Sequence, residues 1–263
     1  MDFEGFVSRL QQRWTDRGNG LIVHRQVDST QQLARLLVRE YVREQCPVPD
    51  VDILAWEQSA GAGRGDHAWS SPAGVGVYTS MVRRLPSART LQWLPMGVAV
   101  ALAEALDPFL HTPCSIKWPN DLLVDGRKLG GILIDGSSRG DSEAIVIIGF
   151  GINNHLPRPE APLEAPSATT VETVAGDAAP LDQLAHGLVT AVDEYLTHSS
   201  ETSDLMTRYT ERSHLRPGDP LRSRLPGGEL VEGIFEGFDD QGFVLLRDDK
   251  GSRRVTAGVL ETL

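Results

Sequence analysis

The stretch Lys117-Trp-Pro-Asn-Asp-Leu-Leu-Val-Asp-Gly-Arg-Lys-Leu-Gly-Gly131 contains two of the three lysines in this chain of 263 residues. The third is Lys250, and every other member of the 25 Lys and Arg residues is an arginine. A flexible ammonium and a planar guanidinium differ in reach and geometry, so they are not interchangeable where a side chain holds an anionic oxygen. The two lysines therefore favour an anion-binding site. The alternative is a solvated hairpin in which lysines occur by chance.

On both sides of this stretch, the hydrophobic pattern predicts strands and helices in alternation. The dipeptide Asp125-Gly126 predicts a hairpin turn inside the stretch itself. Helical spacing of apolar residues and short apolar runs predict the remaining elements. We expect helices at 3–14, from 30 to a point before Pro47, and at 91–106, 181–198 and 204–212, and strands at 21–27, 51–56, 74–83, 115–118, 121–124, 131–135 and 144–152. The sequence thus predicts an α+β fold: a mixed, mostly antiparallel sheet with helices on one side.

The composition changes near Arg216. After it, short alternating segments are separated by turns at 226–228, 239–242 and 248–251, which predicts a small β-barrel. We therefore expect two domains, at 1–213 and 214–263. Prolines and small residues dominate 156–180, where we expect a long surface loop.

Composition excludes several classes of protein. The net charge of −11 argues against a nucleic-acid-binding protein, although a local cationic cluster can still hold an anionic ligand. No apolar run is long enough to span a bilayer, and the N-terminus lacks the apolar core of a signal peptide. Cys46 and Cys114 are expected to be free thiols in a reducing cytoplasm. The seven histidines show no metal-ligand spacing.

A second feature is the loop from Ser59 to Trp69, which contains three glycines and Arg64. Glycines let backbone N–H groups approach a ligand closely, and such loops often bind anions. The spacing matches neither a dinucleotide-binding fingerprint nor a P-loop. Taken alone, the loop is more simply a glycine-rich surface turn.

Four motifs in a fixed order carry a more specific signal. They are Asp28-Ser-Thr-Gln31, Gln58-Ser-Ala-Gly-Ala-Gly-Arg64 with Trp69-Ser-Ser-Pro72, Lys117-Trp-Pro-Asn-Asp121 with Arg127-Lys-Leu-Gly-Gly-Ile132, and Ile148-Gly-Phe-Gly-Ile-Asn153. From about Val27 to the C-terminus the sequence resembles the biotin protein ligases, also called biotin–acetyl-CoA-carboxylase ligases. The resemblance implies a class II synthetase-like catalytic domain of the biotin–lipoate ligase type, followed by an SH3-like barrel.

The resemblance also implies an activity. Members of this family make biotinyl-5'-adenylate from biotin and ATP and transfer biotin to a lysine of a biotin carboxyl carrier domain. Two anions meet in the first step, so catalysis depends on positioning and on neutralisation of charge. The implied catalytic residues are Lys128, Lys117 and Arg64. The implied biotin contacts are Ser29, Thr30, Gln31, Gln58, Ala62, Gly63, Arg64, Lys128 and Gly131; the implied ATP contacts are Trp69, Lys117, Asn120 and Asn153; and Asp121 is the candidate Mg²⁺ ligand.

Each residue also has a plainer interpretation. Ser29 and Thr30 can serve only to cap a helix, and Trp69 can be a core aromatic. Asp121 and Asn153 can be turn residues with local hydrogen bonds. The order of all the motifs together, not any single residue, favours the ligase.

The glycine-rich loop departs from the family pattern Gly-Arg-Gly-Arg-x-Gly-Arg-x-Trp. Ala62 and His67 stand where arginines are common, and Asp66 adds a negative charge. We therefore expect an active ligase whose first step is slower or whose adenylate is released more readily.

Two other functions remain open. A lipoate ligase or transferase shares the catalytic fold, and a non-catalytic biotin-binding sensor would keep the cavity without turnover. Only about twenty residues precede the first expected strand, too few for the helix-turn-helix of family members that repress transcription, so we expect no DNA-binding role. A homodimer formed through an exposed sheet edge is compatible with the resemblance.

Overall fold

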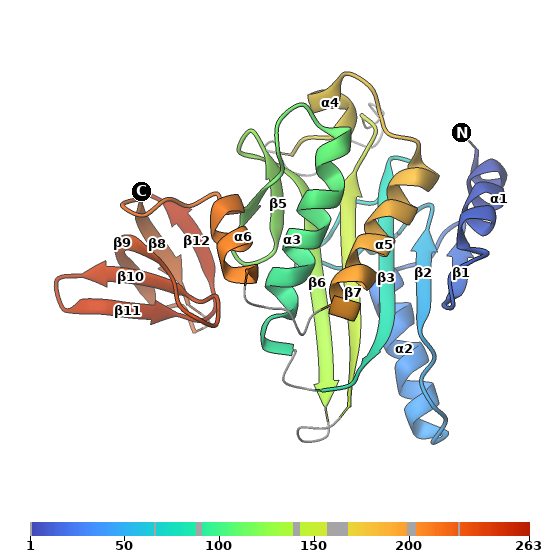
Figure 1. The fold of residues 1–263 in the computed structure, drawn as a ribbon, viewed down its shortest axis with the longest axis horizontal. Helices are drawn as coiled ribbons and strands as arrows, with labels where there is room; N and C mark the ends of the chain where they lie inside the picture. Colours follow the sequence, from blue (N-terminus) through green and yellow to red (C-terminus); the bar gives the residue numbers. More distant parts are fainter. Residues whose placement is uncertain are drawn as a thin grey trace.

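The larger part of the molecule is a seven-stranded sheet. The computed structural model describes residues 2–65, 67–87, 91–138, 143–156, 168–198, 204–225 and 227–263. The strand order is β1-β2-β3-β7-β6-β5-β4, and every neighbouring pair is antiparallel except β1 with β2 (Figure 1). The strands are β1 (Gly20–His24), β2 (Val51–Ala55), β3 (Gly76–Leu85), β4 (Ser115–Lys117), β5 (Asp121–Val124), β6 (Arg127–Ser138) and β7 (Ala144–Asn153). The predicted mixed, mostly antiparallel sheet is confirmed.

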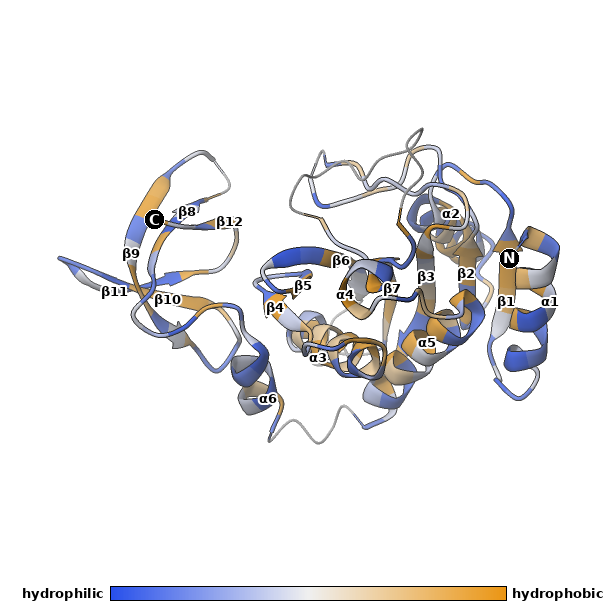
Figure 2. Ribbon diagram, turned by 90° about the horizontal axis from the view of Figure 1, so that it is seen from above, coloured by the Kyte–Doolittle hydropathy of each residue, from blue (hydrophilic) through white to orange (hydrophobic). Residues whose placement is uncertain are grey.

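Helices cover both faces of this sheet, whereas the sequence predicted helices on one side. Figure 2 shows α3 and α5 on one side of the strands and α2 on the other. The reason lies in the central strand β7, whose residues are apolar in both alternating sets. Val146 and Ile148 join the larger core, whereas Ile147 joins a second cluster with Ala34 of α2. The helices are α1 (Phe3–Trp14), α2 (Thr30–Arg43), α3 (Leu94–Leu106), a 3-10 turn η2 (Asp107–Phe109), α4 (Val171–Ala175), α5 (Leu181–His198) and α6 (Leu205–Arg212).

The sequence explains where α2 begins and ends. The Ser29 hydroxyl accepts a hydrogen bond from the Gln32 N–H, so it caps the helix, as Asp28-Ser-Thr predicted. The helix ends at Arg43, before Pro47, and Gln45 then adopts a φ of 56°. This start brings Ser29, Thr30 and Gln31 to the sheet face that α2 covers, close to β3.

A network of buried charges joins α5 to β2 and β3. The Arg83 guanidinium is 4% exposed and contacts the Asp52 carboxylate at 2.5 Å. Asp193 of α5 accepts from Arg83 at 2.7 Å, and Arg17 also pairs with Asp193. Trp14 of α1 donates its indole N–H to Asp52 at 2.9 Å. The fully buried Asp52 carboxylate is therefore neutralised and hydrogen-bonded, as buried charges require.

The smaller part of the molecule is a five-stranded antiparallel sheet in the order β11-β10-β9-β8-β12, as predicted for a C-terminal barrel. Figure 2 shows it to one side of the larger sheet, beyond α6. The Trp118 indole N–H donates to the Gly242 carbonyl at 3.1 Å, and the His214 N–H donates to the Ile116 carbonyl at 2.7 Å. The strands are β8 (Pro220–Arg224), β9 (Leu230–Phe238), β10 (Val244–Asp248), β11 (Gly251–Val255) and β12 (Val259–Thr262).

The surface loop expected at 156–180 can be compared with the structure only in part, because residues 157–167 lie outside the described residues. Asp66 of the glycine-rich loop and Pro226 of an expected turn also lie outside them. Its second half is not a surface loop. Thr169 and Thr170 are fully buried, and α4 follows them. The Asn154 side chain bonds both the N–H and the carbonyl of Ala179, so the segment is fixed against β7 by amide hydrogen bonds that its composition did not indicate.

Among the described residues, no helix is both long enough and apolar enough to cross a membrane.

Candidate active site

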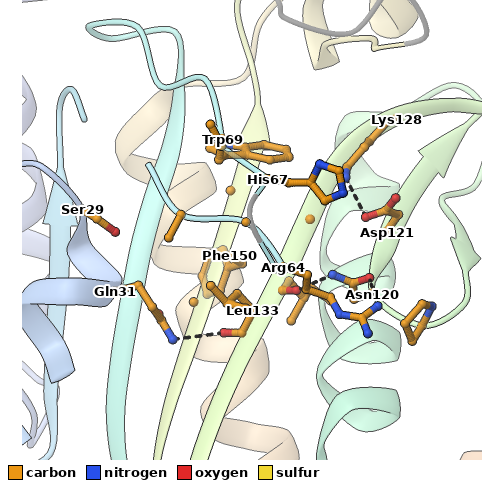
Figure 3. A pocket seen from close by; sticks show the side chains of 18 of the residues that line it. Ser29, Gln31, Arg64, His67, Trp69, Asn120, Asp121, Lys128, Leu133 and Phe150 are labelled. Carbon is orange, nitrogen blue, oxygen red and sulfur yellow. Dashed lines mark hydrogen bonds and ion pairs between the residues drawn. The ribbon is translucent and has the colours of Figure 1, made fainter. Parts of the chain in front are cut away.

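A cavity of about 310 Å³ lies on the α2 face of the large sheet. Figure 3 shows side chains from α2, the glycine-rich loop, β6 and β7 converging on it. Four sets of residues line it: one from the start of α2, one from the glycine-rich loop and the large sheet, one from the turn before β5, and one from the start of β12. The barrel contributes Gly258, Val259 and Leu260, so the two parts of the fold build one wall together.

Glycines form the floor of the cavity. Gly131 of β6 pairs in register with Gly151 of β7, and Gly149 lies two residues earlier on the same face. A Cβ on Gly151 would lie 2.4 Å from the Trp69 indole nitrogen, and a Cβ on Gly149 would lie 2.3 Å from the Gln31 amide oxygen. Trp69 and Gln31 therefore occupy the space that side chains at positions 151 and 149 would otherwise fill.

Cationic side chains gather at one end of the cavity. The Lys128 ammonium lies 2.7 Å from the Asp121 carboxylate and 5.4 Å from the centre of the Trp69 ring. Lys117 lines the same end, one residue before the cis peptide bond between Trp118 and Pro119. Lys128 is thus held by a carboxylate, and an anion that binds Lys128 must compete with it.

The amide of Asn120 connects this end to the glycine-rich loop. Its oxygen accepts from the Arg64 guanidinium at 3.3 Å, and its nitrogen donates to the Ile132 carbonyl at 2.8 Å. The Ile132 N–H returns a hydrogen bond to the Asn120 carbonyl at 2.9 Å. Asn120 is therefore held by hydrogen bonds to β6, and it in turn positions Arg64 over the cavity.

The glycine-rich loop is a short hairpin. The Trp69 N–H donates to the Gly61 carbonyl and the Gly63 N–H donates to the His67 carbonyl, both at 2.8 Å. Gly65, at the tip, has a φ of 60°, a conformation that glycine adopts without strain. A Cβ on Gly61 would lie 2.3 Å from the Trp69 carbonyl oxygen, so the hairpin can close only with glycine there.

Neutral polar groups surround the opposite end. The Thr30 N–H donates to the Gln58 amide oxygen at 2.8 Å, and the Gln58 nitrogen donates to the Ser71 hydroxyl at 2.7 Å. Ser29, Thr30 and Gln31 are all at most 3% exposed. This end is closed, polar and uncharged, which suits a neutral ring with its own donors and acceptors.

The structure brings together thirteen of the fourteen residues that the sequence suggested for the site. Asn153 is the exception. It does not line the cavity, is 5% exposed and donates to the Thr169 carbonyl at 3.1 Å, so in this structure it fixes the segment before α4. Its contact with ATP stays a prediction.

Sequence reasoning missed several residues of the cavity: Ser80, Leu133, Gly149, Phe150 and the barrel residues 258–260. Gly149 and Gly151 alternate along β7, and this alternation was a readable signal for a hollow on one face. The barrel residues left no such signal, because their position depends on how the two sheets pack.

A magnesium site requires oxygen ligands, among which carboxylates are usual. Of the described residues that line the cavity, Asp121 is the one with a carboxylate. Among the described residues there is no group of three or more His, Cys, Asp or Glu side chains placed to hold a metal. One carboxylate plus substrate phosphates and water is a usual Mg²⁺ environment, so the residues fit an ion that arrives with ATP.

Two family models match the chain. Residues 23–153 match the Biotin/lipoate A/B protein ligase family, and residues 221–259 match the Biotin protein ligase C terminal domain. The first match ends with β7 and contains the cationic end, the glycine-rich hairpin and the neutral end. The second contains most of the five-stranded sheet.

Individual relatives agree with the models. The chain is 32% identical over 214 residues to the biotin--[acetyl-CoA-carboxylase] ligase of Paracoccus denitrificans, covering 78% of this chain and 87% of the relative. It is 30% identical to the bifunctional ligase/repressor BirA of Bacillus subtilis, over 93% of this chain and 74% of the relative. Among solved structures, the biotin protein ligase of Aquifex aeolicus in complex with biotin and ATP has a TM-score of 0.74 at 25% identity, covering 93% of this chain and 99% of that one. The chain therefore belongs to the biotin protein ligase family.

Proposed function

We propose that this chain is an ATP-dependent biotin–protein ligase. The observation that carries the proposal is a single cavity with two unlike ends: a closed, neutral, hydrogen-bonding end at Ser29, Thr30 and Gln58, and a cationic end at Lys117, Lys128 and Arg64. An acid with a polar ring fits this arrangement if its carboxylate lies among the cations. ATP phosphates would then meet the carboxylate at the same end.

In the first step a carboxylate oxygen of biotin forms a bond to the α-phosphorus of ATP, and the bond from that phosphorus to pyrophosphate breaks. Lys128 and Lys117 lower the repulsion between the two anions and stabilise the charge that develops on the phosphoryl oxygens. In the second step the amine of a carrier lysine attacks the acyl carbon, and AMP leaves.

The remaining assignments of the site belong to the same proposal. Trp69 would contact the nucleotide through its ring, and its buried indole N–H, which has no hydrogen-bond partner among the described residues, lies against Gly151. Asp121 would hold a Mg²⁺ ion that neutralises the phosphates. Ala62, Gly63 and Gly131 would contact biotin through backbone atoms, because they carry a small side chain or none.

The partner that we propose is the biotin carboxyl carrier domain of acyl-CoA or pyruvate carboxylases, acting in the cytoplasm where ATP is available. The division of the chain into 1–213 and 214–263, and a homodimer formed through a sheet edge, stay predictions. Limited proteolysis and sedimentation measure them directly.

One assay separates the candidate functions. The protein is incubated with ATP, Mg²⁺, a biotin carboxyl carrier domain and either biotin or lipoate, and acylation of the carrier is followed by mass spectrometry. Modification with biotin supports the proposal, and modification with lipoate alone replaces it with a lipoate ligase. Tight biotin binding without acylation of the carrier would instead establish a sensor.

A further inference from the structure

A buried hydroxyl outside the cavity joins two residues that line it. Ser71 is 4% exposed and is not among the residues that line the cavity. Its hydroxyl accepts a hydrogen bond from the Gln58 amide nitrogen at 2.7 Å and donates one to the Trp69 carbonyl at 3.2 Å. Gln58 belongs to the neutral end, whereas the Trp69 ring lies on the side of Lys128 (Figure 3). One side chain thus holds a residue from each end of the cavity.

A backbone group fixes the direction of both hydrogen bonds. The Thr30 backbone N–H donates to the Gln58 amide oxygen at 2.8 Å, so the amide nitrogen is the atom that faces Ser71. An amide nitrogen donates and does not accept, so the Ser71 oxygen is the acceptor of that pair. The Ser71 proton is then directed to the Trp69 carbonyl oxygen, which can only accept. The two bonds therefore form together and do not compete for the hydroxyl.

Gly61 leaves the space in which these groups meet. A Cβ at position 61 would clash with the Trp69 carbonyl oxygen and would lie 2.9 Å from the Ser71 hydroxyl oxygen and 3.1 Å from the Gln58 amide nitrogen. The backbone encloses the same point, because the Trp69 N–H donates to the Gly61 carbonyl at 2.8 Å and the Gln58 N–H donates to the Ser71 carbonyl at 3.1 Å. The Ser71 hydroxyl is the side-chain group that connects the two strands of this hairpin.

We propose that Ser71 is a positioning residue for both substrates: through the Gln58 amide it orders the contact with biotin, and through the Trp69 carbonyl it places the ring that contacts the nucleotide. The inference rests on the proposed function, because it requires biotin at the neutral end and ATP beside Trp69. Without the hydroxyl, Gln58 and Trp69 each lose one hydrogen bond, and a small misplacement of groups beside a ligand weakens binding and slows reaction.

The test removes the hydroxyl in two ways, by Ser71→Ala and by Ser71→Cys, whose thiol is a weak hydrogen-bonding group. Calorimetric titration without ATP measures biotin affinity in the full chain. Steady-state biotinylation of a carrier domain at saturating biotin measures KM for ATP. We expect both variants to bind biotin about 10-fold more weakly and to show a KM for ATP that is about 10-fold higher, since each substrate loses the support of one hydrogen bond.

A second background separates the two hydrogen bonds. In Gln58→Met the amide is absent, so adding Ser71→Ala is expected to weaken biotin binding no further than Gln58→Met alone. The same addition is still expected to raise KM for ATP by about 10-fold, because the Trp69 carbonyl still loses its donor. A general loss of stability would not remove one effect and keep the other.

Ser213 provides a matched control. It is 1% exposed, its hydroxyl accepts from the Leu215 N–H at 3.1 Å, and it does not line the cavity. Ser213→Ala is expected to leave biotin affinity and KM for ATP unchanged. If the unaltered chain does not bind biotin, the proposed function is wrong. If it binds biotin but the two Ser71 variants match it in biotin affinity or in KM for ATP, or if the biotin effect persists in Gln58→Met, the positioning role is wrong while the function stands.

Discussion

At the scale of single residues, the rare lysines have different environments. Lys128 is paired with Asp121 and lies near the Trp69 ring, inside the cavity. Lys250 is exposed in the turn between β10 and β11, where its backbone N–H donates to Asp248. Composition alone does not distinguish the three lysines. In the folded chain, the Lys128 ammonium faces the cavity, whereas Lys250 is exposed to solvent.

The first prediction concerns Lys128→Arg. The change keeps the charge but replaces a compact ammonium with a wider, planar group that cannot take the same place beside Asp121 and Trp69. We expect adenylate formation, followed as pyrophosphate release, to fall by about 100-fold or more. Lys250→Arg is the control and should be silent. Near-normal activity of Lys128→Arg would mean that the rarity of lysine in this chain carries no functional meaning.

The second prediction concerns His67→Arg. His67 belongs to the glycine-rich hairpin, and its side chain is among those that line the cavity (Figure 3). A permanent cation there should hold the phosphate of the adenylate more tightly. We expect slower release of biotinyl-adenylate from the variant, measured by trapping released adenylate after a single turnover. Unusually slow release from the unaltered chain would contradict the idea that its loop retains the adenylate weakly.

Single residues were predicted well where a motif fixed them. The Ser29–Gln31 and Lys117–Asp121 motifs each reach the cavity as a block. Contacts between residues distant in sequence were not predicted. Asp135, for example, has no motif of its own, and it accepts a hydrogen bond from the Gln31 amide 104 positions away in the sequence. Such pairings arise from strand register, which a single sequence does not reveal.

At the scale of elements, β7 serves two purposes at once. Its earlier residues are apolar on both faces and hold α2, α3 and α5 to the sheet. Its later residues, Gly149 and Gly151, leave one face open to Gln31 and Trp69. The strand itself was predicted from its apolar run, but the expectation of helices on one side failed, since a continuously apolar strand needs cover on both faces.

The third prediction concerns Gly151→Ala. The added methyl would lie 2.4 Å from the Trp69 indole nitrogen, so the ring must move. Misplacement on the order of 1 Å near reacting groups can cost about 100-fold in rate, so we expect at least about a 10-fold loss in kcat/KM for ATP. Steady-state kinetics at saturating biotin measure it.

The control for this change is Gly187→Ala within α5. Apart from its two chain neighbours and the backbone of its own helix, no atom of the described residues lies within 4 Å of the position of the added methyl, so the change removes only the flexibility of glycine. It should raise the free energy of unfolding by up to about 1 kcal/mol and leave kinetics unaltered. A Gly151→Ala enzyme with normal kinetics would show that the ring position is not required.

At the scale of the whole molecule, the buried charges near α1 connect elements distant in sequence. Asp52 of β2 receives Arg83 of β3 and Trp14 of α1, and Asp193 of α5 joins the same network. None of these residues lines the cavity. The network stabilises the edge of the large sheet that lies away from the barrel. We therefore expect a change in this network to affect stability and not catalysis.

The fourth prediction concerns Arg83→Met. The change leaves the fully buried Asp52 carboxylate without its closest cation, and breaking such a pair typically costs about 3–5 kcal/mol. Urea denaturation should show this loss in the free energy of unfolding. Arg222→Gln, which removes an exposed pair with Glu232, should cost less than about 1 kcal/mol. Equal effects of the two changes would contradict the importance of burial.

The arrangement of the two sheets was outside the reach of sequence reasoning. Turn spacing predicted a C-terminal barrel, but not that Trp118 would donate to Gly242 or that β12 would reach the cavity. Both contacts depend on the shapes of two folded surfaces, which local patterns do not specify.

The position of β12 has a consequence for protein synthesis. Ser29 and Leu260 line one cavity, so its wall is complete only after the ribosome has added residue 260. A growing chain can form the large sheet earlier, but it meets biotin and ATP with one side of the cavity missing. Ligand that is present during translation can therefore stabilise the complete chain, but it cannot stabilise the incomplete nascent chain to the same degree.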